Sequence, residues 1–114
     1  MAVMEISIVR EEDYIPECAK NRAEKKPVKV HIKYLSPSED AGTYKANEGT
    51  IVRDRELFFA LSVTAIENLS VKDETGHLQE ITNGAELCST PGLEDYYYDI
   101  ILHINGKAGI DAKN

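Results

Sequence analysis

The sequence predicts an α+β fold, with a small N-terminal antiparallel sheet or hairpin followed by a helical C-terminal half. In residues 27–35, "PVKVHIKYL", apolar and charged side chains alternate, as they do in a strand with one buried face. In residues 93–104, apolar side chains recur at the i, i+3, i+4 and i+7 spacing of one helix face. A chain of 114 residues can bury roughly two-thirds of its unfolded surface around one core, so we expect a single domain over residues 1–114.

Two strands are expected in the N-terminal part. Residues 4–9, "MEISIV", alternate weakly and favour β structure, so they predict a first strand. Residues 27–35 predict a second strand that pairs with it. The buried face of this second strand consists of Val28, Val30, Ile32 and Tyr34. Its opposite face carries lysines and His31 and should be in contact with water.

Two surface loops are predicted beside these strands. Residues 10–26 are dominated by charges, and Pro16 would interrupt a helix, so we expect a long loop with one helical turn near residues 18–24. Residues 36–50 are rich in Gly, Ser, Asp and Asn and predict a second, mobile loop. Long loops in small domains often serve binding.

A long helix is expected to begin after Asp54, whose carboxylate can accept a hydrogen bond from a free backbone N–H of the first turn. The main apolar stripe of this helix contains Leu57, Phe58, Leu61 and Ala65, and it could extend to Asn68 or Leu69. Phe59, Val63 and Ile66 widen the stripe, so the helix should be buried on most sides.

A D-x-x-G turn follows this helix, and residues 66–71 and 78–81 on either side of it could form either a brief hairpin or a connecting loop. The helical stripe continues through Asn68, which leaves little room for a strand before the turn. This continuation favours the connecting loop.

Capping signals predict two further helices. Asn83 and Glu86 fit a capping box, so "NGAELC" is expected to form a short helix. Thr90 as N-cap, followed by Pro91 at the first helical position, predicts the start of the second.

The last helix has one apolar face, made by Leu93, Tyr96, Tyr97, Ile100, Ile101 and Ile104. Residues 105–106, Asn-Gly, predict its end, and residues 107–114 are then a loose polar tail. The two principal helices are expected to pack through Leu57, Phe58 and Leu61 against Leu93, Tyr97, Ile100 and Ile104.

Composition and charge exclude several classes of function. The net charge is −7; ten basic against eleven acidic residues in the first 57 give −1, and three against nine in residues 58–114 give −6. Phosphate would repel such an anionic half, so no nucleic-acid binding is expected. The longest apolar run has ten residues and is too short for a membrane span, which needs about 20. Two distant cysteines and no secretion signal predict a cytoplasmic protein with free thiols.

No catalytic, metal or cofactor motif stands out. Cys88 and His103 could form a thiolate pair, but no local signature surrounds the thiol, and Cys88 is better explained as a small buried apolar residue. The three histidines and two cysteines lack the close pairs typical of zinc sites. We therefore expect no metal, no cofactor and no enzymatic activity.

Contacts with a partner protein are the remaining candidate site. Tyr96 and Tyr97 lie on the apolar face of the last helix, whereas Tyr98 is turned about 100° from Tyr97 and should be more exposed. An exposed tyrosine can anchor a partner. Phe59 and Val63 are further candidates, because they widen the helix stripe beyond what a core requires. A homo-oligomer is also compatible with this sequence.

Two segments carry a resemblance to a known family. They are "DYIPECAKNRAEKKPVKVHIKYLSPSE", residues 13–39, and "LFFALSVTAIENLSVKDETGHLQEITNGAELCSTPGLEDYYYDII", residues 57–101. In order, they resemble the strand, the helix ending in "IENL", the variable turn and the capped helices of small proteins from tailed phages and prophages. The chain is thus similar to tail assembly chaperones of long-tailed phages.

The resemblance implies a function without catalysis. It implies binding to tape-measure or tail-tube proteins in the cytoplasm of a bacterial host before the tail assembles. Two alternatives stay open. One is a structural virion component, such as a head-tail joining or tail-completion protein, and the other is a small enzyme or metal-binding domain.

Overall fold

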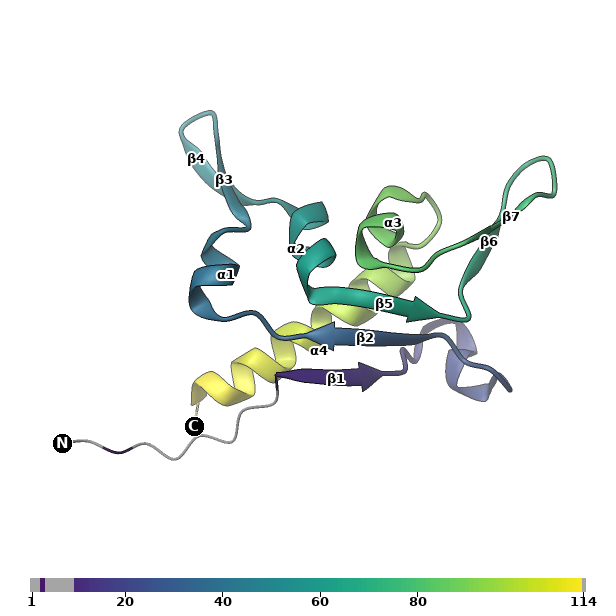
Figure 1. The fold of residues 1–114 in the computed structure, drawn as a ribbon, viewed down its shortest axis with the longest axis horizontal. Helices are drawn as coiled ribbons and strands as arrows, with labels where there is room; N and C mark the ends of the chain where they lie inside the picture. The colour runs from purple at the N-terminus through teal and green to yellow at the C-terminus, as the bar shows by residue number, and fades with distance from the viewer. Residues whose placement is uncertain (1–2, 4–9, 114) are drawn as a thin grey trace.

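The computed structural model describes Val3 and residues 10–113 of the chain, and it confirms the α+β fold class (Figure 1). The helices are the 3-10 helix η1 (Cys18–Ala23), α1 (Pro37–Ala41), α2 (Arg55–Ser62), α3 (Gly84–Ser89) and α4 (Glu94–Lys113). The strands are β1 (Glu11–Tyr14), β2 (Lys29–Lys33), β3 (Tyr44–Asn47), β4 (Thr50–Arg53), β5 (Val63–Glu67), β6 (Ser70–Lys72) and β7 (Leu78–Glu80).

The central sheet has three antiparallel strands in the order β1-β2-β5. In β2, Val30 and Ile32 are fully buried, whereas His31 between them faces the opposite side, beside Asp13 of β1. Helix α4 runs behind the sheet in Figure 1, and its Ile100 belongs to the same hydrophobic cluster as the two β2 residues. The alternation predicted for residues 27–35 is thus confirmed, and one face of the sheet carries charged side chains.

The partner of β2 differs from the prediction. Residues 4–9, predicted as the first strand, lie outside the described residues. The strand that pairs with β2 is β1, which falls inside the segment predicted as a loop over residues 10–26. Its alternation was hidden because the inward position 12 carries a carboxylate, which hydrogen-bonds to His103 and Tyr34. The helical turn expected near residues 18–24 is confirmed in part: η1 lies there, but it is kinked at Ala19 and Lys20, whose φ angles are 52° and 56°.

Helix α2 begins as predicted but is shorter. The Asp54 carboxylate accepts a hydrogen bond from the backbone N–H of Leu57, at 3.1 Å. The helix ends at Ser62, and the following "VTAIE" forms β5 on the edge of β2 instead of continuing the helical stripe. β-branched residues favour strands, and pairing with β2 supplies backbone hydrogen bonds that a longer helix would have kept within itself.

Two hairpins project from the same side of the sheet, near its opposite ends (Figure 1). Strands β3 and β4 form one of them, so the mobile loop predicted over residues 36–50 is wrong. That segment also contains α1, which begins with a capping box between Ser36 and Glu39. Arg53 joins this hairpin to the core: its guanidinium lies 4.3 Å from the ring centroid of Phe58 and 2.6 Å from an Asp40 carboxylate oxygen.

Strands β6 and β7 form the second hairpin, where a connecting loop was favoured. The turn is held by Asp73, whose carboxylate accepts hydrogen bonds from the backbone N–H groups of Thr75 and His77, both at 2.9 Å. Gly76 adopts φ = 85°, a value that favours glycine. The brief hairpin that was the weaker alternative is therefore the structure of this segment.

Helix α3 begins where the sequence predicts, because Asn83 accepts a hydrogen bond from the N–H of Glu86 at 2.9 Å. The predicted cap at Thr90 is wrong, since its hydroxyl donates to the carbonyl of Glu86 at the end of α3. Helix α4 begins only at Glu94. It also continues past the predicted stop at residues 105–106 and through the predicted tail to Lys113.

Helix α2 is rotated about its axis relative to the predicted packing, so a different set of its side chains enters the core. Phe58 and Phe59 are buried, whereas Leu57 and Leu61 are 40% and 39% exposed. The Phe59 ring stacks on Tyr97 of α4 with 4.8 Å between centroids. Within residues 10–113, no helix combines the length and the apolar character needed to cross a bilayer.

Candidate protein-contact site

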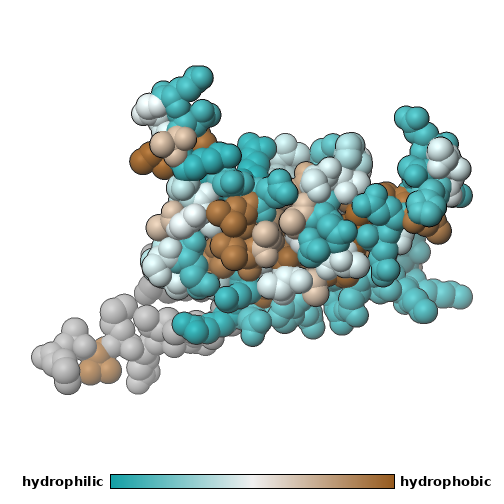
Figure 2. All heavy atoms as spheres, turned by 45° about the horizontal axis from the view of Figure 1, so that its top comes forward, coloured by the Kyte–Doolittle hydropathy of each residue, from teal (hydrophilic) through white to brown (hydrophobic). Residues whose placement is uncertain are grey.

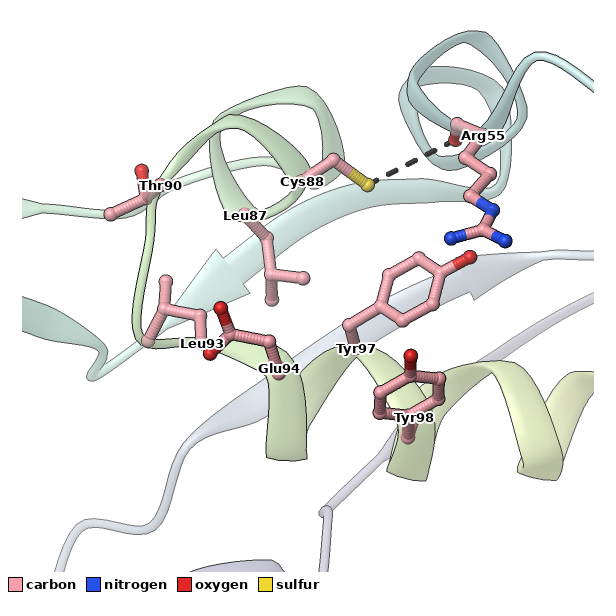
Figure 3. Close-up of a pocket in the computed structure, with 8 residues that line it drawn as sticks. All are labelled: Arg55, Leu87, Cys88, Thr90, Leu93, Glu94, Tyr97 and Tyr98. Carbon is pink, nitrogen blue, oxygen red and sulfur yellow. Dashed lines mark hydrogen bonds between the residues drawn. The ribbon is translucent and has the colours of Figure 1, made fainter.

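A shallow pocket of about 190 Å³ lies where the ends of three helices meet (Figure 3). Its lining comes from the first residue of α2, the end of α3, the segment that joins α3 to α4, and the first turns of α4. It includes Tyr98, the exposed tyrosine singled out from the sequence. We call it the helix-end pocket.

Local sequence signals place each wall of this pocket. The Asp54 cap starts α2, so Arg55 is its first residue, and the Asn83 cap starts α3, so Leu87 falls in its second turn. Gly92 has φ = 95°, a conformation that glycine adopts without strain. This residue lets the chain turn from α3 into α4 and brings Leu93 beneath the pocket.

Apolar side chains form the base of the helix-end pocket. Leu87 and Leu93 are buried and belong to the main core cluster, and the half-buried Tyr97 lies beside them. Tyr97 is held by its stack on Phe59 and by an edge contact with Tyr98, 5.2 Å between ring centroids. Since these side chains are fixed by the core, the base of the pocket is preformed.

The two ends of the helix-end pocket carry opposite charges. The Arg55 guanidinium lies toward the hydroxyl end of Tyr97, and the Glu94 carboxylate lies at the other end, near Leu93 (Figure 3). Burial raises the pKa of Tyr97, and the nearby charge of Arg55 partly offsets this rise. Among the ion pairs of the described residues, none joins Arg55 to Glu94.

Cys88 also lines the helix-end pocket, but its thiol is not activated. Its sulfur lies 3.9 Å from the carbonyl oxygen of Arg55. Burial and the charge of Glu56 raise the pKa of Cys88 to about 11. Burial and the charge of Asp99 likewise raise the pKa of Cys18 to about 11. Because the thiolate is the nucleophile, these environments favour a packing role for both cysteines.

The raised thiol pKa values predict slow alkylation. Relative to an ordinary value of 9.0, a pKa two units higher leaves about 100-fold less thiolate at pH 8. We expect iodoacetamide to label both cysteines in the native protein about 100-fold more slowly than in urea-unfolded protein, with mass spectrometry as the readout. Equal rates in the two states would contradict the raised values.

Of the three contact candidates predicted from the sequence, one is exposed in the structure and two are buried. Tyr98 is 55% exposed at the rim of the helix-end pocket, so it stays a contact candidate. Phe59 and Val63 are both 0% exposed, and their assignment as contact residues is corrected: they are core residues. The rotation of α2 and the start of β5 at Val63 turn both side chains inward, and Leu57 and Leu61 are exposed instead.

A second cluster, at the junction of β1, η1 and α4, was missed by sequence reasoning. Asp99 of α4 accepts hydrogen bonds from the Tyr14 hydroxyl and from the backbone N–H groups of Glu17 and Cys18, the latter two at 2.9 Å. His103, one turn further along, stacks on Tyr14 with 3.8 Å between ring centroids. These contacts hold α4 against β1 and the start of η1, whose residues lie more than 80 positions earlier in the chain. No local sequence pattern could have indicated them.

The Asp99 contacts predict acid sensitivity. Burial acts to raise the pKa of Asp99, but the hydrogen bonds from Tyr14 and the two N–H groups outweigh it and leave the pKa below 3.8. As the pH falls, the unfolded state therefore takes up a proton first. Stability from this group is complete above about pH 4 and is lost as the pH falls through the folded-state pKa.

We expect the Asp99→Asn variant to be less stable at pH 7 by about 1–2 kcal/mol, because charge-assisted hydrogen bonds are lost. Its stability should fall less steeply than that of the wild type below about pH 4. Urea unfolding between pH 2.5 and 7 measures both effects. Parallel pH profiles of variant and wild type would contradict the role of Asp99.

Two histidines of the described residues lie beside carboxylates. Within the described part of the chain, no three His, Cys, Asp or Glu side chains are grouped to hold a metal ion. His31 lies on the charged face of the sheet, 2.9 Å from Asp13 and 3.1 Å from Glu11, and both hydrogen bonds raise its pKa. His103 pairs with Glu12 at 2.6 Å. Both histidines are thus held by carboxylates from β1.

The helix-end pocket and the exposed residues of α2 are therefore the surfaces best suited to a partner. The pocket has an apolar base, two charged ends and no activated nucleophile. Comparison of the chain with protein-family models, with curated proteins and with solved structures found no match.

Proposed function

We propose that the chain is a non-catalytic protein-binding domain that acts in the assembly of a phage or prophage tail, in the cytoplasm of the bacterial host. The observation that supports binding is the exposure of Leu57 and Leu61, about two-fifths each, on one face of α2. Two leucines one helical turn apart form a ready contact for an apolar surface. The choice of tail proteins as partners rests on the resemblance of residues 13–39 and 57–101 to tail assembly chaperones.

The surroundings of α2 suit a docking surface. Figure 2 shows hydrophobic surface over the middle of the molecule and on the projecting hairpins, surrounded by polar side chains. Ile51 of β4 and Leu78 of β7 are exposed on those hairpins. A partner seated on α2 would thus find further apolar contacts on either side, with a polar rim that keeps the free protein soluble.

Co-purification tests this proposal. The tagged chain is co-expressed with a tape-measure protein, or with a tail-tube protein, from the same phage or prophage. We expect at least one of them to be retained on the tag. Retention of neither would contradict the proposed function. Detection of the chain in purified particles would instead favour a structural virion component, since an assembly chaperone leaves the finished tail.

A matched pair of variants locates the contact. Leu57→Ser combined with Leu61→Ser should abolish retention of the partner. Because about three-fifths of each side chain is buried, the unfolding temperature of this variant is measured beside its retention, to verify that it is folded during the co-purification. Leu102→Ser makes the same chemical change on α4, at a side chain that is 68% exposed. We expect this control to retain the partner. Equal loss in both variants would show that general hydrophobicity, and not α2, holds the partner.

A further inference from the structure

We infer that the helix-end pocket is an anchor site for one apolar side chain of a partner peptide whose carboxylate pairs with Arg55. The inference rests on the proposed protein-binding function and specifies the chemistry of the bound segment. The pocket volume of about 190 Å³ is smaller than the roughly 300–1,000 Å³ of sites for drug-sized molecules. A single side chain is therefore the better match, as in the anchors that dominate many protein interfaces.

The base of the pocket accepts an apolar group. Leu87 and Leu93 are buried beneath it, and Tyr97 and Tyr98 supply aromatic walls. Tyr97 cannot turn away readily, because its ring is stacked on the fully buried Phe59. A preformed apolar base lowers the ordering cost of binding, so even a single side chain can gain affinity there.

The charge of Arg55 at one end of the pocket indicates which group of the partner peptide lies beside its apolar side chain. Arg55 is the first residue of α2, where the helix dipole is positive and a cation is not favoured. The neighbouring Asp54 carboxylate is occupied by the Leu57 N–H and lies 3.7 Å from the Lys45 ammonium. In the described part of the chain, Arg55 has no ion-pair partner within 4.0 Å. Its guanidinium can therefore bind a carboxylate in a two-pronged contact.

Glu94 at the opposite end gives the site a direction. Its carboxylate accepts a hydrogen bond from the Gly92 N–H at 3.3 Å and is otherwise exposed. A peptide carboxylate placed at that end would be repelled, whereas at the Arg55 end it would be attracted. The pocket thus selects an acidic group on the α2 side of the apolar anchor.

Three small probes with the same ring test this chemistry: 3-phenylpropionate, its neutral amide 3-phenylpropanamide, and the cation phenethylamine. Each is titrated into the ¹⁵N-labelled chain of 114 residues and followed by amide chemical shifts. We expect the acid to shift the amides of Arg55, Leu87 and Tyr98, and to bind about fivefold more tightly than the amide, the size of a partly exposed ion pair. Equal affinity for acid and amide, shifts confined to other residues, or no shifts at all would overturn the inference.

Charge variants give the matched control. Arg55→Gln should reduce the affinity for the acid to that for the amide, and Arg55→Glu should make phenethylamine the strongest of the three probes. Arg55 is exposed, so both variants are expected to fold, and their amide spectra verify this directly. Lys29→Gln removes a cation from the charged face of the sheet and should leave all three affinities unchanged.

Failure of this inference is distinguishable from failure of the proposed function. The probe titrations need no tail protein, and the co-purification does not depend on Arg55 being the contact. If a tail protein is retained by the wild type and by Arg55→Glu alike, the protein-binding function stands and the anchor site is wrong. If the probes bind as expected and no tail protein is retained, the anchor site stands and the assembly role is wrong.

Discussion

Replacing Gly84 with alanine should destabilise the protein by about 3 kcal/mol, near the upper end of the usual cost of overpacking. A Cβ atom added to Gly84 would lie 2.2 Å from the carbonyl oxygen of Phe59 and 2.9 Å from the Cβ of Val63. The nearer contact is backbone, which cannot rotate away as a side chain could. Relief therefore requires α3 to move away from α2 and β5, which would open the core around Phe59.

Urea unfolding of the wild type and the variant measures this loss, provided that the free energy of unfolding falls with urea concentration at the same slope in both proteins. Gly106→Ala provides the matched control, because nothing lies within 4 Å of a Cβ built at Gly106 in α4. Helix propensity alone should make this control more stable by up to about 1 kcal/mol. If Gly84→Ala were as stable as Gly106→Ala, the close packing of α3 on α2 would be wrong.

The position of Gly84 also shows which parts of the fold could be predicted from the sequence. Asn83, the residue before it, is a cap that predicts the start of α3, and the Asp54 cap predicts the start of α2 in the same way. Caps are predictable because the side chain and the N–H group it binds are only three residues apart. Position 84 requires a glycine because of the Phe59 carbonyl, which lies 25 positions earlier in the chain. No local sequence pattern indicates this requirement.

Elements that depend on distant partners were the ones predicted wrongly. "VTAIE" has the spacing of a helix stripe, but it becomes β5 because it pairs with β2, whose residues lie more than 30 positions earlier. Similarly, the acidic β1 resembles a loop until its inward Glu12 meets His103 of α4. Tertiary pairing outweighed the helical spacing of the first segment and the loop-like, charged composition of the second. The inward carboxylate of Glu12 is accommodated because His103 of α4 and the Tyr34 hydroxyl both hydrogen-bond to it.

The candidate site was predictable in part for the same reason. The helical period of α4 places Tyr97 on the buried face and Tyr98 beside it, and the structure agrees with both positions. No sequence pattern indicated Arg55 as a site residue, because its side chain comes near Tyr97 only when the fold brings the ends of α2 and α4 together. Phe59 and Val63 were predicted to widen the stripe of one long helix, but α2 is rotated and ends at Ser62, and β5 begins at Val63, so both side chains are buried.

Replacing Asn21 with alanine should have an effect comparable to that of the glycine change. Asn21 is 2% exposed, and its side-chain amide donates hydrogen bonds to the carbonyl oxygens of Pro16 (2.7 Å) and Val28 (3.0 Å). Its carbonyl oxygen accepts a third bond, from the Val28 N–H at 2.7 Å. Truncation leaves three buried backbone groups without this partner, so we expect a loss of about 3 kcal/mol in urea unfolding. Asn47→Ala, at an exposed asparagine in β3, should remain within about 0.5 kcal/mol of wild type.

The Asn21→Asp variant separates lost hydrogen bonds from lost packing, because it keeps the shape of the side chain. At pH 7 its carboxylate could still accept from the Val28 N–H, but it would face two carbonyl oxygens with no proton to offer. Burial beside these oxygens raises the pKa of the introduced carboxyl in the folded state, so protonation favours folding. The stability of this variant relative to wild type should therefore increase as the pH falls from 7 toward 4. A pH-independent difference, or an alanine variant as stable as wild type, would show that water replaces these bonds and that Asn21 does not hold η1 to the start of β2.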